Sequence, residues 1–366
     1  MGSILFFNRS SVHYRKAIYK LLEQELDVDF YFGDSRPGKI VKIDYSYLHN
    51  FRCEVKNVVF YEPIYWQKGV LKLLFRRYHG YLTPGDIWCI STWLFAILCK
   101  IRGKKLYFWT HGWYGKENFL ERIIKKIFYS LPTDIFLYGE YAKNLMIKNG
   151  ISSNKLHVVY NSLDYDTQVL QRRKLKSDDL YKEKFGNKYN NLIFVGRLTK
   201  VKRLDMLLEA VALLKRMSSF YNITLVGGGE VEKELQDLSF KLGIEKQIWF
   251  YGECYNEQEL SNLIFQADLC VSPGNVGLTA MHMMVYGTPV LTHDCLSMQM
   301  PEFEAIEKKV TGDFFTFGSV ESLADSIEKW FLQNLSREEI RLNCYRMIDE
   351  KYNPHKQIEV FKSVIK

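Results

Sequence analysis

Residues 191–203 read NLIFVGRLTKVKR: an apolar run ends at Gly196, and four cations follow within the next seven residues. A pattern typical of an amphipathic helix then covers 203–217. A short apolar run that ends in glycine and leads into a helix is typical of a buried parallel strand with its crossover helix. The segment therefore predicts an α/β fold with a parallel sheet.

The same alternation extends in both directions from this segment. We expect strands in the first half at 4–7, 29–32, 58–61, 87–91, 105–112, 134–139 and 156–160, and in the second half at 191–196, 223–229, 248–252, 269–274 and 289–294. We expect helices at 14–26, 68–79, 93–101, 118–130, 140–149, 203–217, 230–242, 256–266, 278–286, and near 320–333 and 336–350. Such repeats predict doubly wound sheets, which bind ligands beyond the carboxyl ends of their strands.

A chain of 366 residues is longer than one ordinary domain, which predicts two domains. The charged interval 166–190 has the composition of a junction between them. We expect an N-terminal Rossmann-like domain over 1–165 and a C-terminal Rossmann-like domain over 166–350. These two domains are expected to face each other across a cleft. The helix expected at 351–366 should pack back on the N-terminal domain.

Three segments carry candidate chemistry. In the first, Arg197 and Lys202 lie just after Gly196 and before a helix, where cations suit a phosphate or diphosphate. A basic, solvated helix start is the alternative for the same residues. The second segment is Gly227-Gly228-Gly229, which either brings the backbone close to a ligand or makes a tight turn.

The third segment is SPGNVGLTAMHMMVYGTPV, residues 272–290. A strand ends in a Pro/Gly loop, and a helix begins near Gly277 and Leu278, whose free amides can hold an anion. His282 falls about one turn further along, where a lone histidine can also be purely structural.

Together these segments resemble glycosyltransferase family 4. The pattern is F-x-G-R-L-x-x-x-K over 194–202, a glycine cluster, and a Pro/Gly loop with G-L-x(8)-G-x-P-V over 277–290. Two weaker matches are WTHG (109–112) and VYNSLD (159–164). The resemblance implies the GT-B fold and a retaining transferase that moves a sugar from a nucleotide diphosphate sugar to a glycan or lipid-linked acceptor in polysaccharide biosynthesis.

The resemblance implies that the domain at 1–165 binds the acceptor and that the domain at 166–350 binds the nucleotide sugar. By the same resemblance, Arg197, Lys202 and His111 are the catalytic residues. The first two would hold the donor diphosphate with the amides of Gly277 and Leu278, and His111 would face the sugar. The remaining donor-side candidates are Gly196, Gly228, Gly229, Asn275, His282, Glu302 and Glu304.

The sequence departs from the family at its two glutamates, whose positions hold Gly274 and His282. A histidine can still hydrogen-bond ribose hydroxyls. Gly274 offers no side chain, so Asn275, with Glu302 and Glu304, is the candidate for contacts with the sugar. The departure leaves sugar specificity open and makes a non-catalytic nucleotide-sugar-binding protein an alternative. A nucleotide-sugar epimerase of the same fold is a second alternative, although no acid/base carboxylate pair is evident.

The charge is concentrated in the first half. Residues 1–165 hold 24 Lys+Arg and 14 Asp+Glu, a balance of +10, whereas residues 166–366 hold 26 and 28, a balance of −2. Residues 70–78 and 119–128 read as amphipathic basic helices, which either lie on an anionic membrane or pack on the core with a solvated face. After the first strand, Arg9, His13 and Arg15 are acceptor-side candidates, with a plain helix cap as the alternative; Asn161 is a fourth acceptor-side candidate.

Other patterns point away from cofactors and nucleic acid. The two D-x-D spacings, Asp27/Asp29 and Asp164/Asp166, could bind a divalent ion, but the Arg197/Lys202 pair already supplies positive charge. We expect no metal and no other cofactor. Seven scattered cysteines form no C-x-x-C pair, and no nucleic-acid-binding pattern occurs. Without a signal segment, the chain is expected in the cytoplasm, with peripheral association at the inner face of the plasma membrane as a hypothesis.

Overall fold

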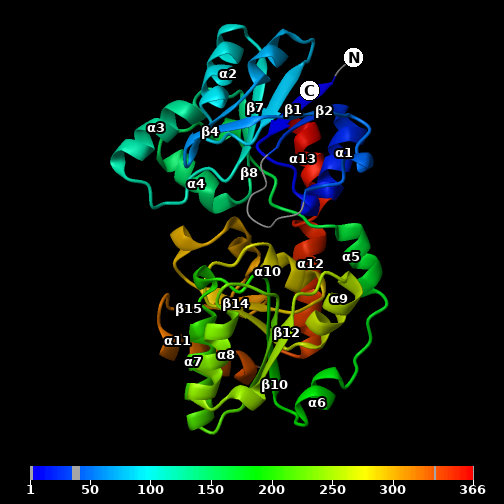
Figure 1. Cartoon of the computed structure of the whole chain (residues 1–366), viewed down its shortest axis with the longest axis vertical. Helices are drawn as coiled ribbons and strands as arrows, with labels where there is room; N and C mark the ends of the chain where they lie inside the picture. The colour runs from blue at the N-terminus through cyan, green and yellow to red at the C-terminus, as the bar shows by residue number, and fades with distance from the viewer. Residues whose placement is uncertain (1–2, 35–41, 334, 366) are drawn as a thin grey trace. The chain divides into compact units, whose positions relative to one another are not determined.

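The chain folds as two compact α/β units, each built on a parallel sheet (Figure 1). The computed structural model describes residues 3–34, 42–333 and 335–365. Unit 1 comprises Met1–Asp164 and Asn353–Lys366, and unit 2 comprises Tyr165–Tyr352. The end of the chain therefore returns to the unit in which the chain begins.

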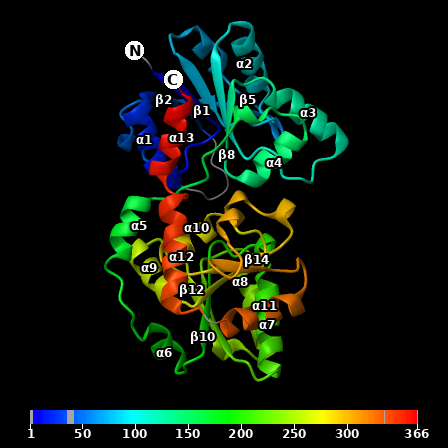
Figure 2. The same ribbon diagram turned by 180° about the vertical axis from the view of Figure 1, so that it is seen from behind.

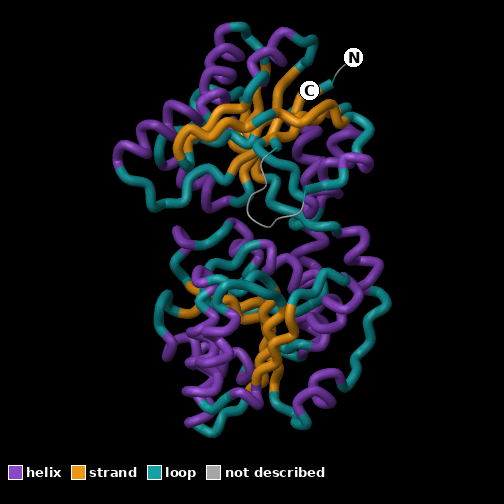
Figure 3. The backbone as a smooth tube through the Cα atoms, viewed as in Figure 1, coloured by secondary structure: helices purple, strands orange, loops and turns teal. Residues whose placement is uncertain are grey.

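Unit 1 contains a sheet of seven parallel strands within its described residues. In spatial order they are β3 (Phe51–Val55), β2 (Val28–Gly33), β1 (Ile4–Asn8), β6 (Gly80–Thr83), β7 (Lys105–Thr110), β8 (Asp134–Leu137) and β9 (Leu156–Val158). The helices of unit 1 are α1 (Lys16–Leu26), α2 (Ile90–Ile101), α3 (Phe119–Tyr129), α4 (Glu140–Lys148) and α13 (Pro354–Val364). Short 3-10 helices are η1 (His13–Arg15), η2 (Tyr45–Tyr47), η3 (Val70–Phe75) and η4 (Ser153–Lys155). Helices cover both faces of the sheet (Figure 3), so most side chains of its central strands β1, β6 and β7 are buried.

Helix α13 packs beside α1, and both views of the ribbon show the two helices adjacent (Figures 1 and 2). The ring of Phe361 lies 5.1 Å from that of Trp109 and 4.4 Å from that of Phe136. Lys362 forms an ion pair with Glu25 at 2.5 Å. Residues far apart in sequence thus share one core.

Two expected elements of the first half are wrong. The strand expected at 87–91 is the turn before α2 and the start of that helix, because the carboxylate of Asp86 accepts the amide of Trp88 and turns the chain. The strand at this place in the sheet is Gly80–Thr83. The helix expected at 68–79 is only η3, whose Val70, Leu73 and Leu74 face the core.

Residues 58–61 do form a strand, but it does not join the parallel sheet. β4 (Asn57–Tyr61) pairs antiparallel with β5 (Ile64–Gln67) in a separate two-stranded ribbon. The chain reverses directly between Tyr61 and Ile64, which leaves no room for a crossover helix.

Unit 2 contains a sheet of six parallel strands within its described residues. In spatial order they are β12 (Ile248–Gly252), β11 (Tyr221–Val226), β10 (Asn190–Val195), β13 (Leu269–Ser272), β14 (Val290–His293) and β15 (Gly312–Phe315). The helices are α5 (Tyr165–Arg172), α6 (Leu180–Phe185), α7 (Leu204–Arg216), α8 (Glu232–Leu242), α9 (Glu257–Gln266), α10 (Leu278–Val285), α11 (Val320–Leu332) and α12 (Arg337–Glu350). The 3-10 helices are η5 (Lys200–Lys202), η6 (Glu245–Gln247), η7 (Leu296–Met298) and η8 (Pro301–Ala305). By order along the chain this sheet reads 3-2-1-4-5-6, the Rossmann order.

The fold-class prediction of two Rossmann-like parallel-sheet domains is confirmed. Among the described residues, no helix combines the length and the hydropathy that a membrane span needs.

Candidate active site

The strand order of unit 2 reverses between β10 and β13, and a doubly wound sheet binds its ligand at the carboxyl ends of such a pair. Gly196 and Arg197 directly follow β10, and residues 273–277 directly follow β13. Two hydrogen bonds join these segments: Gly274 N donates to Lys202 O at 2.9 Å, and Thr279 Oγ1 donates to Val195 O at 3.1 Å. The structure therefore brings the first and third candidate segments together.

The ammonium group of Lys202 is fixed against the loop after β13. Its Nζ donates to the backbone oxygen of Asn275 at 2.8 Å and to Oδ1 of the same residue at 2.9 Å. Burial, followed by the charge of Arg197, lowers the pKa of Lys202 to about 8, against an opposing effect of Glu302. Because this ammonium group is partly buried beside a second cation, a bound anion would stabilise its charged form.

The absence of a side chain at Gly274 has a steric cause. A Cβ atom at this position would lie 2.0 Å from the backbone oxygen of Val201 and 2.7 Å from Cα of Lys202. No side chain fits there without displacing the loop. The glycine thus permits the close approach that lets Asn275 hold Lys202.

Helix α10 begins beside these groups. Gly277 is its N-cap and provides no side-chain cap. The amide of Ala280 donates to Gly277 O at 3.0 Å, so the amides of Leu278 and Thr279 are the ones at this helix start that can hold an anion. The amide of Val276 is already bound to Oε1 of Gln299 at 2.8 Å. Arg197 is exposed and lines a hollow of about 150 Å³ with Gly196, Gly228, Val195, Val226, Gly227, Glu253, Cys254 and Tyr255.

The glycine cluster after β11 mainly serves backbone packing. A Cβ at Gly227 would lie 2.0 Å from Gly196 O, and one at Gly229 would lie 2.1 Å from Leu198 O. These two glycines let the loop after β11 lie directly on the loop after β10. Gly228 faces the carboxylate of Glu253 instead, with a Cβ position 2.8 Å from Oε1.

His282 contacts a carboxylate that sequence reasoning missed. Its Nε2 lies 3.0 Å from Oε1 of Glu257, at the start of α9, and Tyr286 and Gln168 contact the same oxygen. Burial would raise the pKa of Glu257, but the hydrogen bond and charge of His282 and the other two donors lower it to about 2. Nothing in the sequence signals this contact, because Glu257 and His282 lie 25 residues apart on different elements.

In unit 1, the structure brings together Arg15 and His111. The guanidinium of Arg15 lies over the ring of Trp109 and donates to the hydroxyl of Tyr138, and His111 lies against the ring of Tyr138 at 4.6 Å. Burial and the charge of Arg15 lower the pKa of His111 to about 4, so its imidazole is neutral near pH 7. Nδ1 of His111 is buried and has no hydrogen-bond partner among the described residues.

The other acceptor-side candidates do not join this pair. Arg9 lies over the ring of Tyr65 and within 3.6 Å of Oε1 of Glu62. His13 is exposed on η1. Asn161 is buried, and its Oδ1 accepts the amide of Ser162 at 3.0 Å.

The two remaining donor-side candidates differ in their relation to Lys202. Glu302 is buried on η8, close enough for its charge to act on Lys202. Glu304, on the same 3-10 helix, is half-buried.

The first D-x-D spacing is used for structure. The carboxylate of Asp29 contacts Arg52 at 2.8 Å and accepts the hydroxyl of Tyr78 at 2.6 Å. In the part of the chain that the structure describes, no group of three or more His, Cys, Asp or Glu side chains is arranged to hold a metal ion.

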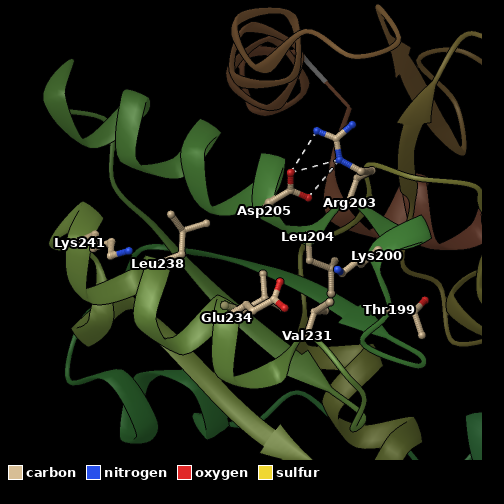
Figure 4. Close-up of a pocket in the computed structure, with 10 residues that line it drawn as sticks. Thr199, Lys200, Arg203, Leu204, Asp205, Val231, Glu234, Leu238 and Lys241 are labelled. Carbon is tan, nitrogen blue, oxygen red and sulfur yellow. Dashed lines mark hydrogen bonds and ion pairs between the residues drawn. The ribbon is translucent and has the colours of Figure 1, made fainter.

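A larger cavity in unit 2, of about 440 Å³, lies between the starts of α7 and α8 (Figure 4). It is lined by Thr199, Lys200, Arg203, Leu204, Asp205, Val231, Glu234, Leu235, Leu238 and Lys241. Arg203 pairs with Asp205 at 3.0 Å. None of the donor-side candidates lines this cavity, so we place the candidate site at the β10–β13 loops instead.

Comparison with solved structures identifies the fold. A crystal structure of Anabaena Alr3699/HepE in complex with UDP matches with a TM-score of 0.71 and 16% identity, over 100% of this chain and 99% of that chain. The two parallel-sheet α/β units define the GT-B fold of glycosyltransferases.

Comparison with protein families places the match in unit 2. Residues 176–347, less than half of the chain, match the family described as "Glycosyl transferases group 1". This region contains the β10 and β13 loops with Arg197, Lys202 and α10.

Two curated relatives are similar to the chain over part of their length. An uncharacterized 41.2 kDa protein in the cps region of Klebsiella pneumoniae is 28% identical over 64% of this chain and 64% of its own length. The lipopolysaccharide 1,6-galactosyltransferase of Salmonella typhimurium is 22% identical over 51% of this chain and 49% of its own length. The chain thus spans 64% and 49% of the length of these two relatives, less than two thirds in both cases.

Proposed function

We propose that the protein is a retaining glycosyltransferase of the family 4 type, which transfers a hexosyl or related residue from a nucleotide diphosphate sugar to a glycan or lipid-linked acceptor. The observation that carries the proposal is the position of Lys202. Its ammonium group is held by Asn275 beside the start of α10, where the strand order of unit 2 reverses. The match of residues 176–347 to glycosyl transferases group 1 and the UDP bound in the Anabaena structure support it.

In this proposal the donor diphosphate binds to Arg197, Lys202 and the first amides of α10. As the bond between the anomeric carbon and the phosphate oxygen breaks, negative charge develops on the diphosphate. Lys202, which Asn275 holds in place, and the start of α10 stabilise that charge with little reorganisation, and the exposed Arg197 adds a second cation. The acceptor hydroxyl forms the new bond on the same face and gives its proton to the departing phosphate, so the step needs no catalytic carboxylate and no metal.

The remaining donor contacts differ from the family pattern. Gly274 leaves no space for a carboxylate, so we assign contacts with the sugar to Asn275 and Glu302. His282, oriented by Glu257, is proposed to bind the ribose hydroxyls. The neutral imidazole of His111 suits a hydrogen bond to the sugar rather than an ionic contact.

We place the reaction in polysaccharide biosynthesis, at the cytoplasmic side of a membrane to which the protein binds peripherally. The galactosyltransferase named above acts on lipopolysaccharide, which supports a surface-glycan product. The excess positive charge of residues 1–165, 24 cations against 14 acids, supports contact with anionic lipid.

A thermal-shift panel of nucleoside diphosphates and their sugar conjugates tests donor binding, because a ligand stabilises the fold by mass action. Lys202→Met should weaken binding of the best ligand by about tenfold or more, since it removes a charge-assisted contact. Lys200→Met is the matched control: this exposed lysine lies two residues away and should leave binding unchanged.

The proposal fails if no nucleoside diphosphate shifts the melting temperature or if the two variants behave alike. Donor binding without transfer to any glycan or lipid-linked acceptor would favour the non-catalytic alternative.

A further inference from the structure

Helix α2 exposes an apolar stripe. Ile90, Leu94, Ile97 and Ile101 recur at helical spacing and are all exposed, Ile101 to 75%. The opposite face, with Phe95, Ala96 and Cys99, is buried in the core. A helix with apolar residues on both faces needs a second apolar environment beyond the core of its own unit.

Helix α3 has the same property. Phe119, Leu120, Ile123, Ile124 and Ile127 are exposed, the first two to 76% and 68%. The inward face consists of Lys125, Phe128 and Tyr129. Its outward face therefore combines large apolar side chains with the exposed cations Arg122 and Lys126.

The two helices form one surface. The rings of Trp93 on α2 and Phe128 on α3 lie 4.6 Å apart, and Lys100 Nζ donates to Ser130 O at 3.5 Å. Both ribbon views show the helices as neighbours on one side of unit 1 (Figures 1 and 2). The exposed Phe75 of η3 continues the surface, because Arg102, just after α2, lies over its ring at 4.8 Å. We call the exposed apolar residues of α2 and α3, with Phe75, the α2–α3 surface.

The charge around this surface is almost entirely positive. Residues 68–130, all of which the structure describes, hold 12 Lys+Arg and 3 Asp+Glu, a balance of +9. All three acids make internal contacts. Asp86 binds Tyr65 and the amide of Trp88, Glu117 pairs with Lys125 at 2.6 Å, and Glu121 forms the capping box of α3. The exposed cations of the segment include Lys72, Arg76, Arg77, Lys100, Arg102, Lys116, Arg122 and Lys126.

Beside Phe75 lies an open cationic hollow of about 700 Å³. Its lining residues are Leu74, Phe75, Arg76, Arg77, Tyr78, His79, Arg102, Gly103, Lys104 and Lys105. Five of these ten side chains are lysine or arginine, which suits the phosphate of a lipid headgroup.

We infer that the α2–α3 surface is the docking surface of this protein for an anionic lipid bilayer. Its isoleucine, leucine and phenylalanine side chains enter the boundary of the acyl chains, and the surrounding cations bind lipid phosphates. A protein partner suits the surface less well, because lysine is depleted in protein interfaces. The inference deepens the membrane association in the proposed function, but it does not depend on catalysis.

Co-sedimentation with vesicles tests the inference directly. The full chain should bind vesicles of phosphatidylcholine with about one third phosphatidylglycerol, bind pure phosphatidylcholine weakly, and dissociate from the anionic vesicles as salt is raised. Arg122→Glu with Lys126→Glu should lower the partition coefficient by about tenfold or more, because each cation near such a surface contributes measurably. Phe119→Ser with Leu120→Ser should lower it similarly while leaving salt sensitivity in place.

Matched controls lie in unit 2. Lys233→Glu with Lys246→Glu reverses two exposed lysines, and Phe240→Ser removes a phenylalanine exposed to 70%. These variants should bind vesicles as the parent does. Binding of the nucleoside diphosphate identified above, measured without vesicles, should be the same in all variants, which separates this inference from the proposed donor site.

The inference is overturned if the parent does not bind anionic vesicles or if α3 and control variants lose binding equally. It is also overturned if sedimentation velocity shows a dimer that the α3 variants abolish, because the surface would then bind a second copy of the chain.

Discussion

Nε2 of His282 lies 3.0 Å from Oε1 of Glu257, and Tyr286 and Gln168 contact the same oxygen at 2.5 and 3.1 Å. Three elements of unit 2, α5, α9 and α10, thus meet at one carboxylate. Position 282 holds a histidine where the family has a glutamate, and the carboxylate of Glu257 contacts that histidine. An ionised carboxylate therefore lies next to His282, one of the candidate donor-side residues.

The pH dependence of stability should report on Glu257. Its pKa is lowered from 4.5 to about 2 in the folded protein, so the stabilisation is complete above pH 4.5 and is lost as the pH falls toward 2. Between about pH 6 and pH 3.5, the free energy of unfolding should fall by on the order of 1 kcal/mol more in the parent than in Glu257→Gln; this figure allows for the partial exposure of the side chain. Urea titrations at the two pH values measure this difference, and equal losses in both proteins would contradict it.

Nucleotide binding should weaken at alkaline pH because of Lys202. The pKa of Lys202 is lowered to about 8, so the free protein loses this proton as the pH rises through 8, whereas a bound diphosphate retains it. The dissociation constant for the nucleoside diphosphate should therefore rise about fivefold between pH 8 and pH 9. Calorimetry in buffers of different ionisation enthalpy should detect proton uptake in this range.

Lys202→Arg is the control for that experiment, because arginine keeps its charge over this range. Any titration of the nucleotide itself will appear in both proteins. A fivefold rise in the variant as well would exclude Lys202 as its cause.

Restoring a side chain at Gly274 should harm binding. Gly274→Ala places its Cβ against the backbone of Val201 and Lys202, so the loop must move, at a cost of about 1–3 kcal/mol in stability. Gly274→Glu should bind the nucleotide more weakly still, although it restores the family residue. Gly277→Ala is the control for the loss of stability only, since its nearest contact would be an ordinary one of 3.8 Å to Met300. It is not a control for binding, because Gly277 belongs to the candidate donor site. Tighter binding by Gly274→Glu would show that the loop accommodates a carboxylate.

The core of unit 1 should depend on the last helix. Phe361→Ala should lower the free energy of unfolding of unit 1 by about 3 kcal/mol, because it leaves a cavity between Trp109 and Phe136. Tryptophan fluorescence during urea unfolding measures the change. Phe240→Ala, at an exposed position, should change it by less than about 0.5 kcal/mol.

The strands that the sequence revealed are apolar runs, and they include the edge strands β9 and β12 as well as central ones. Residues 4–7 and 192–194 are buried between the helices on the two faces of their sheets, so they appear as uninterrupted apolar runs. β3 (FRCEV) lies at an edge and is largely exposed, and β6 (GYLT) is short and begins with glycine. Neither has the composition of a buried strand, and the apolar run of α2 at 87–91 was therefore mistaken for the missing strand.

The candidate site also contains residues that the sequence predicts and contacts that it does not. Arg197, Lys202 and the Gly277 helix start are recognisable because each lies in the connection between a strand and the helix that follows it, β10 to α7 or β13 to α10. Loops that follow neighbouring parallel strands meet at one edge of a sheet. Glu257 and Arg15 act through side chains from other elements, namely His282 and Tyr138. Such contacts depend on packing, and linear spacing contains no signal of them.

The return of α13 to unit 1 also sets the order in which the chain can fold as it is synthesised. Unit 2 is continuous in sequence and is complete when Tyr352 leaves the ribosome, whereas unit 1 still lacks Phe361. The nascent protein must keep the Trp109 side of its first sheet uncovered until Phe361 has been synthesised and has emerged. A ribosome stalled just after unit 2 has emerged would therefore present a folded unit 2 together with an unfinished unit 1.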